Sequence, residues 1–153
     1  MNPELEDLYQ QVLLDHSKRP RNFGALTDGA VQVHGDNPSC GDEIDLSVCF
    51  GPEGAVEDIR FTGQGCAICM ASASMMTLKL KGRSRLEATA LAEAFHTLIT
   101  GGNAAPDRAL GDLQVMEGVR KFPQRVKCAM LAWRAFDQAL TIHESTDRPT
   151  TPP

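Results

Sequence analysis

The stretch IDLSVCF, residues 44–50, decides the fold, because its apolar residues alternate with more polar ones. A period of two is typical of a β-strand that buries one face. The turn sequence GPEG follows at residues 51–54, and we expect residues 56–61 to form the second strand of a hairpin. Val31 and Val33 predict a shorter strand upstream. We therefore expect a small antiparallel sheet of about three strands.

Helical patterns lie on both sides of this sheet in the sequence. Pro3 suits the first position of an N-terminal helix, and residues 66–81 form a second candidate helix. Ser84 and Glu87 have the spacing of a capping box ahead of a third helix, and Pro123 opens a last one. The order predicts an α+β fold, in which helices pack on one face of a small antiparallel three-stranded sheet.

The chain length and charge limit the domain count and the class of protein. The 153 residues suffice for one domain, which we place at residues 1–144, followed by a polar, proline-rich tail at 145–153 that we expect to be disordered. With 15 basic and 20 acidic residues, the net charge of −5 does not favour a nucleic-acid partner. The longest uncharged stretch, residues 61–78, is too polar for a membrane span, and no secretory signal is visible. We therefore expect a soluble cytoplasmic protein.

Five cysteines are many for such a chain. Their number is odd, and the chain shows no export signal. Both facts argue against a disulfide framework and favour metal binding or thiol chemistry. The set is Cys40, Cys49, Cys66, Cys69 and Cys128.

Three of these thiols fall at the predicted ends of distant elements. Cys40 lies in a turn-rich loop, Cys66 at a strand–helix junction, and Cys128 near the start of the last helix. Asp42 follows Cys40 after one glycine, so both side chains could face one ion, and a tetrahedral metal site could close through tertiary structure. The helix dipole at Cys66, and five basic residues without an acid between 118 and 136, would favour thiolates. A solvated basic helix face with an incidental cysteine is equally consistent with the spacing.

Several short motifs occur in an order that resembles the NifU N-terminal/IscU family of iron–sulfur cluster assembly proteins. The similarity runs from the first predicted helix to the last. The motifs are LDH at 14–16, PRN at 20–22, NPSCGD at 37–42, GQGC at 63–66, MASASMM at 70–76, KFP at 121–123 and RVKCA at 125–129.

Within that family the chain is most similar to the SufU branch. Lys127 stands where IscU-type scaffolds carry a histidine, and residues 101–118 resemble the SufU insertion. The resemblance implies a zinc site formed by Cys40, Asp42, Cys66 and Cys128. It also implies a sulfur acceptor that takes persulfide sulfur from a pyridoxal-phosphate-dependent cysteine desulfurase and serves downstream iron–sulfur scaffold proteins. The alternative is a scaffold that assembles an iron–sulfur cluster, or binds iron, on the three cysteines.

Among the three thiols of this implied site, Cys40 is the best sulfur acceptor, because its loop contains Pro38 and Gly41 and can move. Cys69 departs from the family, which usually has serine there, and creates a Cys66-x-x-Cys69 pair. We favour a helix-packing role for Cys69 over a competing ligand. Two further functions remain open, a thiol redox enzyme that uses this pair and a purely structural zinc module. Cys49 lies on the polar strand face and is expected to be a bystander.

Overall fold

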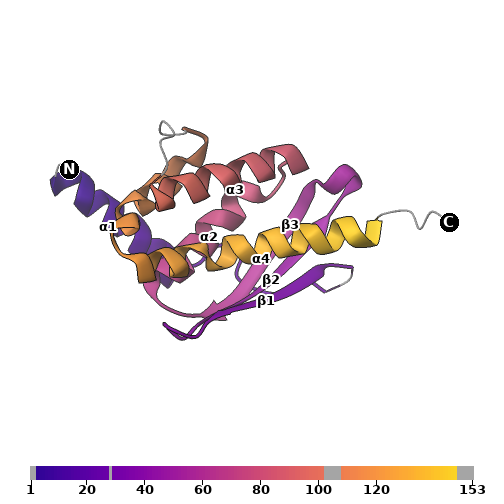
Figure 1. The fold of residues 1–153 in the computed structure, drawn as a ribbon, viewed down its shortest axis with the longest axis horizontal. Coiled ribbons are helices and arrows are strands. Elements are labelled where there is room, and N and C mark those ends of the chain that lie inside the picture. The colour runs from indigo at the N-terminus through magenta and orange to yellow at the C-terminus, as the bar shows by residue number, and fades with distance from the viewer. Residues whose placement is uncertain (1–2, 28, 102–107, 148–153) are drawn as a thin grey trace.

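The computed structural model describes residues 3–27, 29–101 and 108–147. Its elements follow one another as helix, three strands and further helices (Figure 1). They are α1 (Pro3–Lys18), β1 (Val31–Asn37), β2 (Asp42–Phe50), η1 (Pro52–Gly54), β3 (Val56–Gln64), α2 (Ala67–Leu80), α3 (Arg85–Thr100), η2 (Arg108–Lys121) and α4 (Pro123–Asp147), where η marks 3-10 helices.

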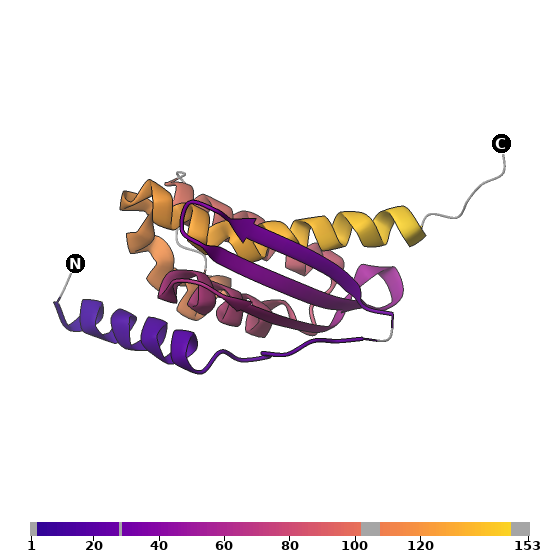
Figure 2. The same ribbon diagram turned by 90° about the horizontal axis from the view of Figure 1, so that it is seen from below.

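The sheet is antiparallel and has the order β1-β2-β3. Helix α4 packs over β1 and β2, while α2 packs over β3 and lies between α1 and α4. Seen from below, β1 and β2 lie in front of α4, and α1 lies to one side (Figure 2). The predicted α+β fold, with a three-stranded antiparallel sheet and helices on one face, is therefore confirmed.

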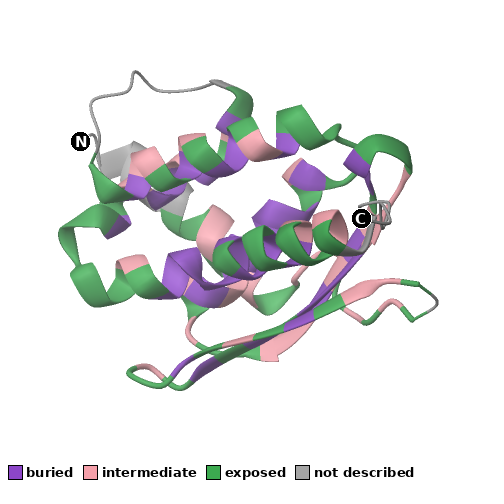
Figure 3. Ribbon diagram, turned by 45° about the vertical axis from the view of Figure 1, so that its right-hand side comes forward, coloured by how far each residue is buried: buried purple, intermediate pink, exposed green. Residues whose placement is uncertain are grey.

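Helix α2 forms the centre of the core. From Cys69 to Leu80 every residue is buried except Met70, Leu78 and Lys79, and buried residues are drawn purple in Figure 3. Its small polar residues make this possible, because each finds a partner on a neighbouring element. The Ser72 hydroxyl donates to the Ala129 carbonyl (2.6 Å) and accepts from the Trp133 indole (3.1 Å), which joins α2 to α4.

Two helices begin where local signals in the sequence predict it. Ser84 and Glu87 form a complete capping box at the start of α3. Gly101 ends α3 in the left-handed conformation, with φ of 83°, which glycine adopts without steric cost. The last helix begins at Pro123, and it continues to Asp147, so residues 145–147 of the predicted tail are helical. The rest of that tail lies outside the described residues.

The strands are longer than predicted at the end of the sheet that carries the cysteines. β2 begins at Asp42, which pairs with Asn37, and β3 continues to Gln64, which pairs with Glu43. Gly63 allows this extension, because a Cβ there would lie 2.2 Å from the Glu43 carbonyl oxygen. The β1–β2 hairpin is thereby closed by only four residues, 38–41.

Within the described part of the chain, no helix has both the length and the apolar character needed to cross a membrane.

The Ser72 bridge between α2 and α4 can be tested by unfolding. Ser72→Ala removes a buried hydroxyl and leaves the Trp133 N–H without its acceptor, so we expect a loss of about 2 kcal/mol in the free energy of unfolding. Urea denaturation followed by circular dichroism measures it. Ser145→Ala, on the exposed surface of α4, is the control and should change stability little. Equal effects of the two substitutions would contradict a structural role for the bridge.

Candidate metal centre

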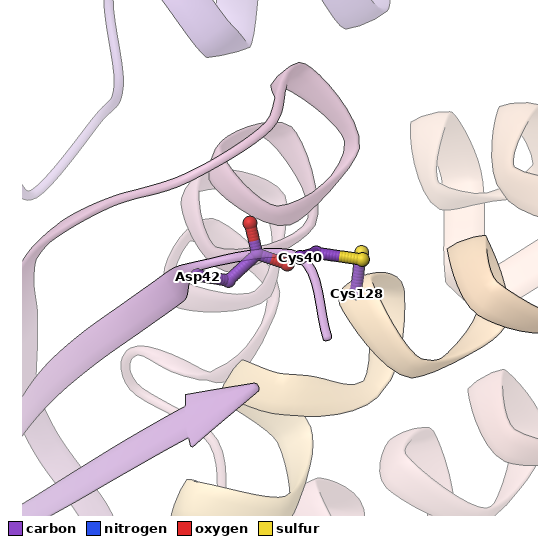
Figure 4. Close-up of side chains that lie close together, drawn as sticks. All are labelled: Cys40, Asp42 and Cys128. Carbon is purple, nitrogen blue, oxygen red and sulfur yellow. The ribbon is translucent and has the colours of Figure 1, made fainter. Parts of the chain in front are cut away.

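Two thiols and one carboxylate converge where the β1–β2 hairpin meets the start of α4. One ligand atom from each of Cys40, Asp42 and Cys128 lies within 4.8 Å of the other two. Figure 4 shows the Cys40 and Cys128 sulfur atoms side by side, with Asp42 adjacent to them. Asp42 and Cys128 are buried, whereas Cys40 is partly exposed. Among the described residues this is the one group of histidine, cysteine or acidic side chains close enough to hold an ion.

The Asp42 side chain is fully buried, and only one of its oxygens is satisfied. Oδ1 accepts the backbone N–H of Cys66 at 2.9 Å, while Oδ2 is buried and has no hydrogen-bond partner among the described residues. Burying a carboxylate oxygen without a partner is costly, and a cation, or the proton of the neighbouring Cys128 thiol, would offset that cost. An oxygen donor beside two sulfur donors suits a divalent metal ion of the zinc type.

Gly65 is the residue that leaves room for this carboxylate. A Cβ built on Gly65 would lie 2.5 Å from Asp42 Oδ1 and 3.1 Å from its Cγ. The glycine directly before Cys66 thus lets the β3–α2 junction approach Asp42 closely. The GQGC motif was the signal for this contact, although the sequence did not show which side chain would fill the space.

Cys66 caps α2, as its predicted place at a helix start suggested. Its Sγ accepts the Cys69 backbone N–H at 3.4 Å, and its own N–H binds Asp42. The Cys66 thiol also borders the site. It is one of the neighbours that raise the pKa of Cys128, and it is the largest cause that raises the pKa of the exposed Arg125. It is outside the group of three whose ligand atoms lie within 4.8 Å, so its role as the fourth ligand stays a prediction.

The electrostatic prediction for Cys128 is wrong. Burial, followed by the neighbouring Asp42, Cys40 and Cys66, raises the pKa of Cys128 well above that of an ordinary thiol. The basic residues near it, including Lys121, Arg125 and Lys127, are exposed, so water screens their charges while Cys128 itself is removed from solvent. Without a metal ion this thiol therefore holds its proton.

The remaining cysteines are outside the group of three, although Cys69 lies near enough for Asp42, Cys66 and Cys40 to act on the pKa of its thiol. Cys69 is fully buried in the core, where burial raises the pKa of its thiol to about 12, and this supports the predicted packing role. Cys49, half-buried on β2, pairs with Asp58 of β3 far from the hairpin tip. All five cysteines are free thiols.

Asn37 is a contributor that the sequence reasoning did not assign. It is buried at the end of β1, and its Nδ2 donates to Cys128 Sγ over 3.8 Å. Its carbonyl accepts the N–H groups of Cys40 and Gly41 at 3.1 and 2.9 Å. Asn37 therefore shapes the turn that carries Cys40 and contacts the opposing thiol. Its place three residues before Cys40, at the strand end, was the available signal.

Comparison with known proteins adds independent evidence. The family model described as NifU-like N terminal domain matches residues 8–129. A Streptococcus pyogenes serotype M1 protein named iron-sulfur cluster assembly scaffold protein IscU is 47% identical over 137 residues, which cover 90% of this chain and 85% of that protein. A Bacillus subtilis strain 168 protein named zinc-dependent sulfurtransferase SufU is 43% identical over 143 residues, covering 94% of this chain and 96% of the relative.

A solved structure shares the architecture. It is titled a putative iron-sulfur cluster assembly scaffold protein for the SUF system, FiSufU, from Fervidobacterium islandicum AW-1. It superposes with a TM-score of 0.80 and 29% sequence identity over 91% of this chain and 99% of that one.

Gly65→Ala tests the close approach to Asp42. The added methyl group overlaps the carboxylate, so we expect a loss of about 1–3 kcal/mol in the free energy of unfolding. Chemical denaturation measures the loss. Gly118→Ala is the matched control, because a Cβ there meets nothing within 4 Å and its φ is not in the left-handed region. Equal stability of Gly65→Ala and the unsubstituted protein would show that Asp42 can move away freely.

Proposed function

Because the chain belongs to the NifU-like N terminal domain family, we propose that it is a zinc-dependent sulfur acceptor, which takes persulfide sulfur from a cysteine desulfurase for iron–sulfur cluster assembly. The proposal depends on the convergence of the Cys40 and Cys128 thiols with the Asp42 carboxylate, one oxygen of which is buried without a hydrogen-bond partner. Cys40 is the only one of these three residues that is partly exposed. The relative named zinc-dependent sulfurtransferase SufU, 43% identical over nearly the whole chain, supports this choice.

In this proposal Cys40, Asp42 and Cys128 hold zinc, and Cys66 supplies the fourth donor. The buried Asp42 Oδ2, which lacks a partner, supports the presence of a cation, and the sulfur-rich donor set is one that zinc accepts. When bound, zinc supplies a charge that keeps buried thiols deprotonated without redox chemistry.

The chemical step belongs to Cys40. Its thiolate attacks the terminal sulfur of the desulfurase persulfide, a new S–S bond forms on Cys40 Sγ, and the S–S bond of the donor breaks. The desulfurase cysteine leaves as a thiolate, so no oxidant or reductant is consumed. Asp42 and Cys128 are buried beside this reaction and exclude water from one side of it.

We place the protein in a reducing cytoplasm, where its five free thiols would persist, with a pyridoxal-phosphate-dependent cysteine desulfurase as donor and iron–sulfur scaffold proteins downstream. A second candidate is the scaffold itself, because the Streptococcus pyogenes relative bears that name. Lys127, exposed beside Cys128, cannot act as the histidine ligand of IscU-type scaffolds and favours the sulfur acceptor. Zinc in a colourless protein supports the acceptor, whereas iron and sulfide in a brown protein support the scaffold.

The metal itself gives the next prediction. Purified protein should contain about one zinc ion per chain by elemental analysis. Removal of zinc by a chelator should lower the melting temperature by about 5–10 °C, because the metal binds only the folded site. Asp42→Ala should lower the zinc content, whereas Asp45→Ala, an exposed acid on the same strand, should not. Zinc-free protein with an unchanged melting temperature would argue against the site.

The role of Cys40 is tested by desulfurase turnover without a strong reductant. The wild-type protein should accelerate turnover and carry added sulfur on Cys40 by mass spectrometry, because it discharges the enzyme persulfide. Cys40→Ser should reduce turnover to the rate of the desulfurase alone. Cys49→Ser, the same change at another half-buried cysteine, should retain full stimulation. Stimulation by Cys40→Ser equal to that of the wild type would overturn the proposal.

A further inference from the structure

A cavity with a mixed polar and apolar lining lies away from the cysteines, between α1, α2 and η2. It has a volume of about 200 Å³, below the roughly 300 Å³ at which sites for drug-sized ligands begin. Three of its lining residues carry ionisable side chains, His16, Lys79 and Asp112. The rest of the lining is Gly111 and an apolar wall of Met75, Leu78 and Leu113. Its size and its mixed lining suit a small polar molecule.

His16 lines this cavity from α1. The side chain is 6% exposed, and Nδ1 lies 2.7 Å from Ser74 Oγ. Ser74 Oγ already accepts the Arg21 backbone N–H at 2.8 Å, so its hydroxyl hydrogen is available for His16 Nδ1. Burial, and after it the Arg21 charge, lowers the pKa of His16 and favours the neutral ring. In the neutral tautomer in which Ser74 donates to Nδ1, the ring hydrogen lies on Nε2, at the opposite edge from Ser74.

Lys79 supplies a positive charge from the other wall. Its Nζ passes so close to Gly111 that a Cβ there would lie 2.7 Å from it, and Gly111 has φ of +54°. The absence of a side chain at this position therefore keeps the ammonium group within the cavity lining. Lys79 forms no salt bridge with any described residue.

Asp112 provides a negative charge at the same cavity, next to Gly111. It is exposed and likewise has no salt bridge with a described residue. The cavity lining thus carries a cation, an anion and His16, and Asp112 lies near enough to His16 to act on its pKa. A ligand that carries both charges close together would satisfy both.

We propose that this cavity binds a small zwitterionic α-amino acid with an apolar side chain. Its carboxylate would contact Lys79 and His16, its ammonium group would contact Asp112, and the apolar wall would receive the side chain. The site does not involve the cysteine group, so the proposal is independent of the proposed sulfur transfer.

The experiment titrates the zinc-loaded full chain, without desulfurase, with L-alanine, and observes backbone amide signals by NMR. L-Alanine should shift the signals of Gly111, Asp112 and Lys79. Acetate and methylamine, which carry one charge each, should bind more weakly by at least about tenfold.

Two variants locate the binding. Lys79→Met and Asp112→Asn should each weaken L-alanine binding by about tenfold or more, because each removes one charged contact. Lys18→Met, an exposed lysine at the end of α1 that does not line the cavity, is the matched control and should bind normally. Asp112 is exposed, so Asp112→Asn tests the site even where Lys79→Met fails to fold.

Three results would overturn the proposal. The first is the absence of shifts at the cavity residues at saturating L-alanine. The second is acetate binding as tightly as L-alanine, which would make the cavity a simple anion site. The third is an equal loss in Lys18→Met, which would show non-specific charge attraction.

Discussion

The hydrogen bond between the Cys66 N–H and Asp42 Oδ1 is the contact on which the cysteine site depends. It ties the start of β2 to the start of α2, two elements far apart in the sequence. It also fixes the carboxylate with its second oxygen buried and without a partner. A carboxylate oxygen buried without a partner costs free energy, which a cation or a proton beside it would offset. In the proposed zinc protein, folding of this region and binding of the metal would therefore be coupled.

Helix α2, which begins next to Cys66, is hydrogen-bonded to the helices on both sides of it. Ser72 binds α4 close to Cys128, and Ser74 binds both α1 and the segment after it. Small hydroxyl residues in the centre of a core allow close packing, and they also fix the register of neighbouring helices through directed hydrogen bonds. The elements that carry Cys66 and Cys128 are thus aligned by groups that never touch a metal ion.

Much of this arrangement could be predicted from the sequence, because it depends on local signals. The alternation at 44–50 and the Ser84–Glu87 box each act over a few residues, and each is found in the structure. The meeting of Cys40 with Cys128 could be expected from their places at element ends. The burial of Cys128 and the contact of Asp42 with Cys66 depend on tertiary packing, which residue types alone do not encode. The Lys79–Gly111 contact was unpredictable for the same reason, since η2 has no clear periodicity.

The hairpin turn that carries Cys40 is more rigid than its Pro and Gly residues suggest. Strand pairing continues to Asn37 and Asp42, and two N–H groups of the turn bind one carbonyl. The reach of Cys40 Sγ is then set by rotation about its own side-chain bonds, which is a short distance. The hairpin therefore does not carry Cys40 over a long distance. A sulfur donor would have to reach the hairpin tip with a mobile segment of its own. The length and flexibility of that segment would then determine which donors can be used.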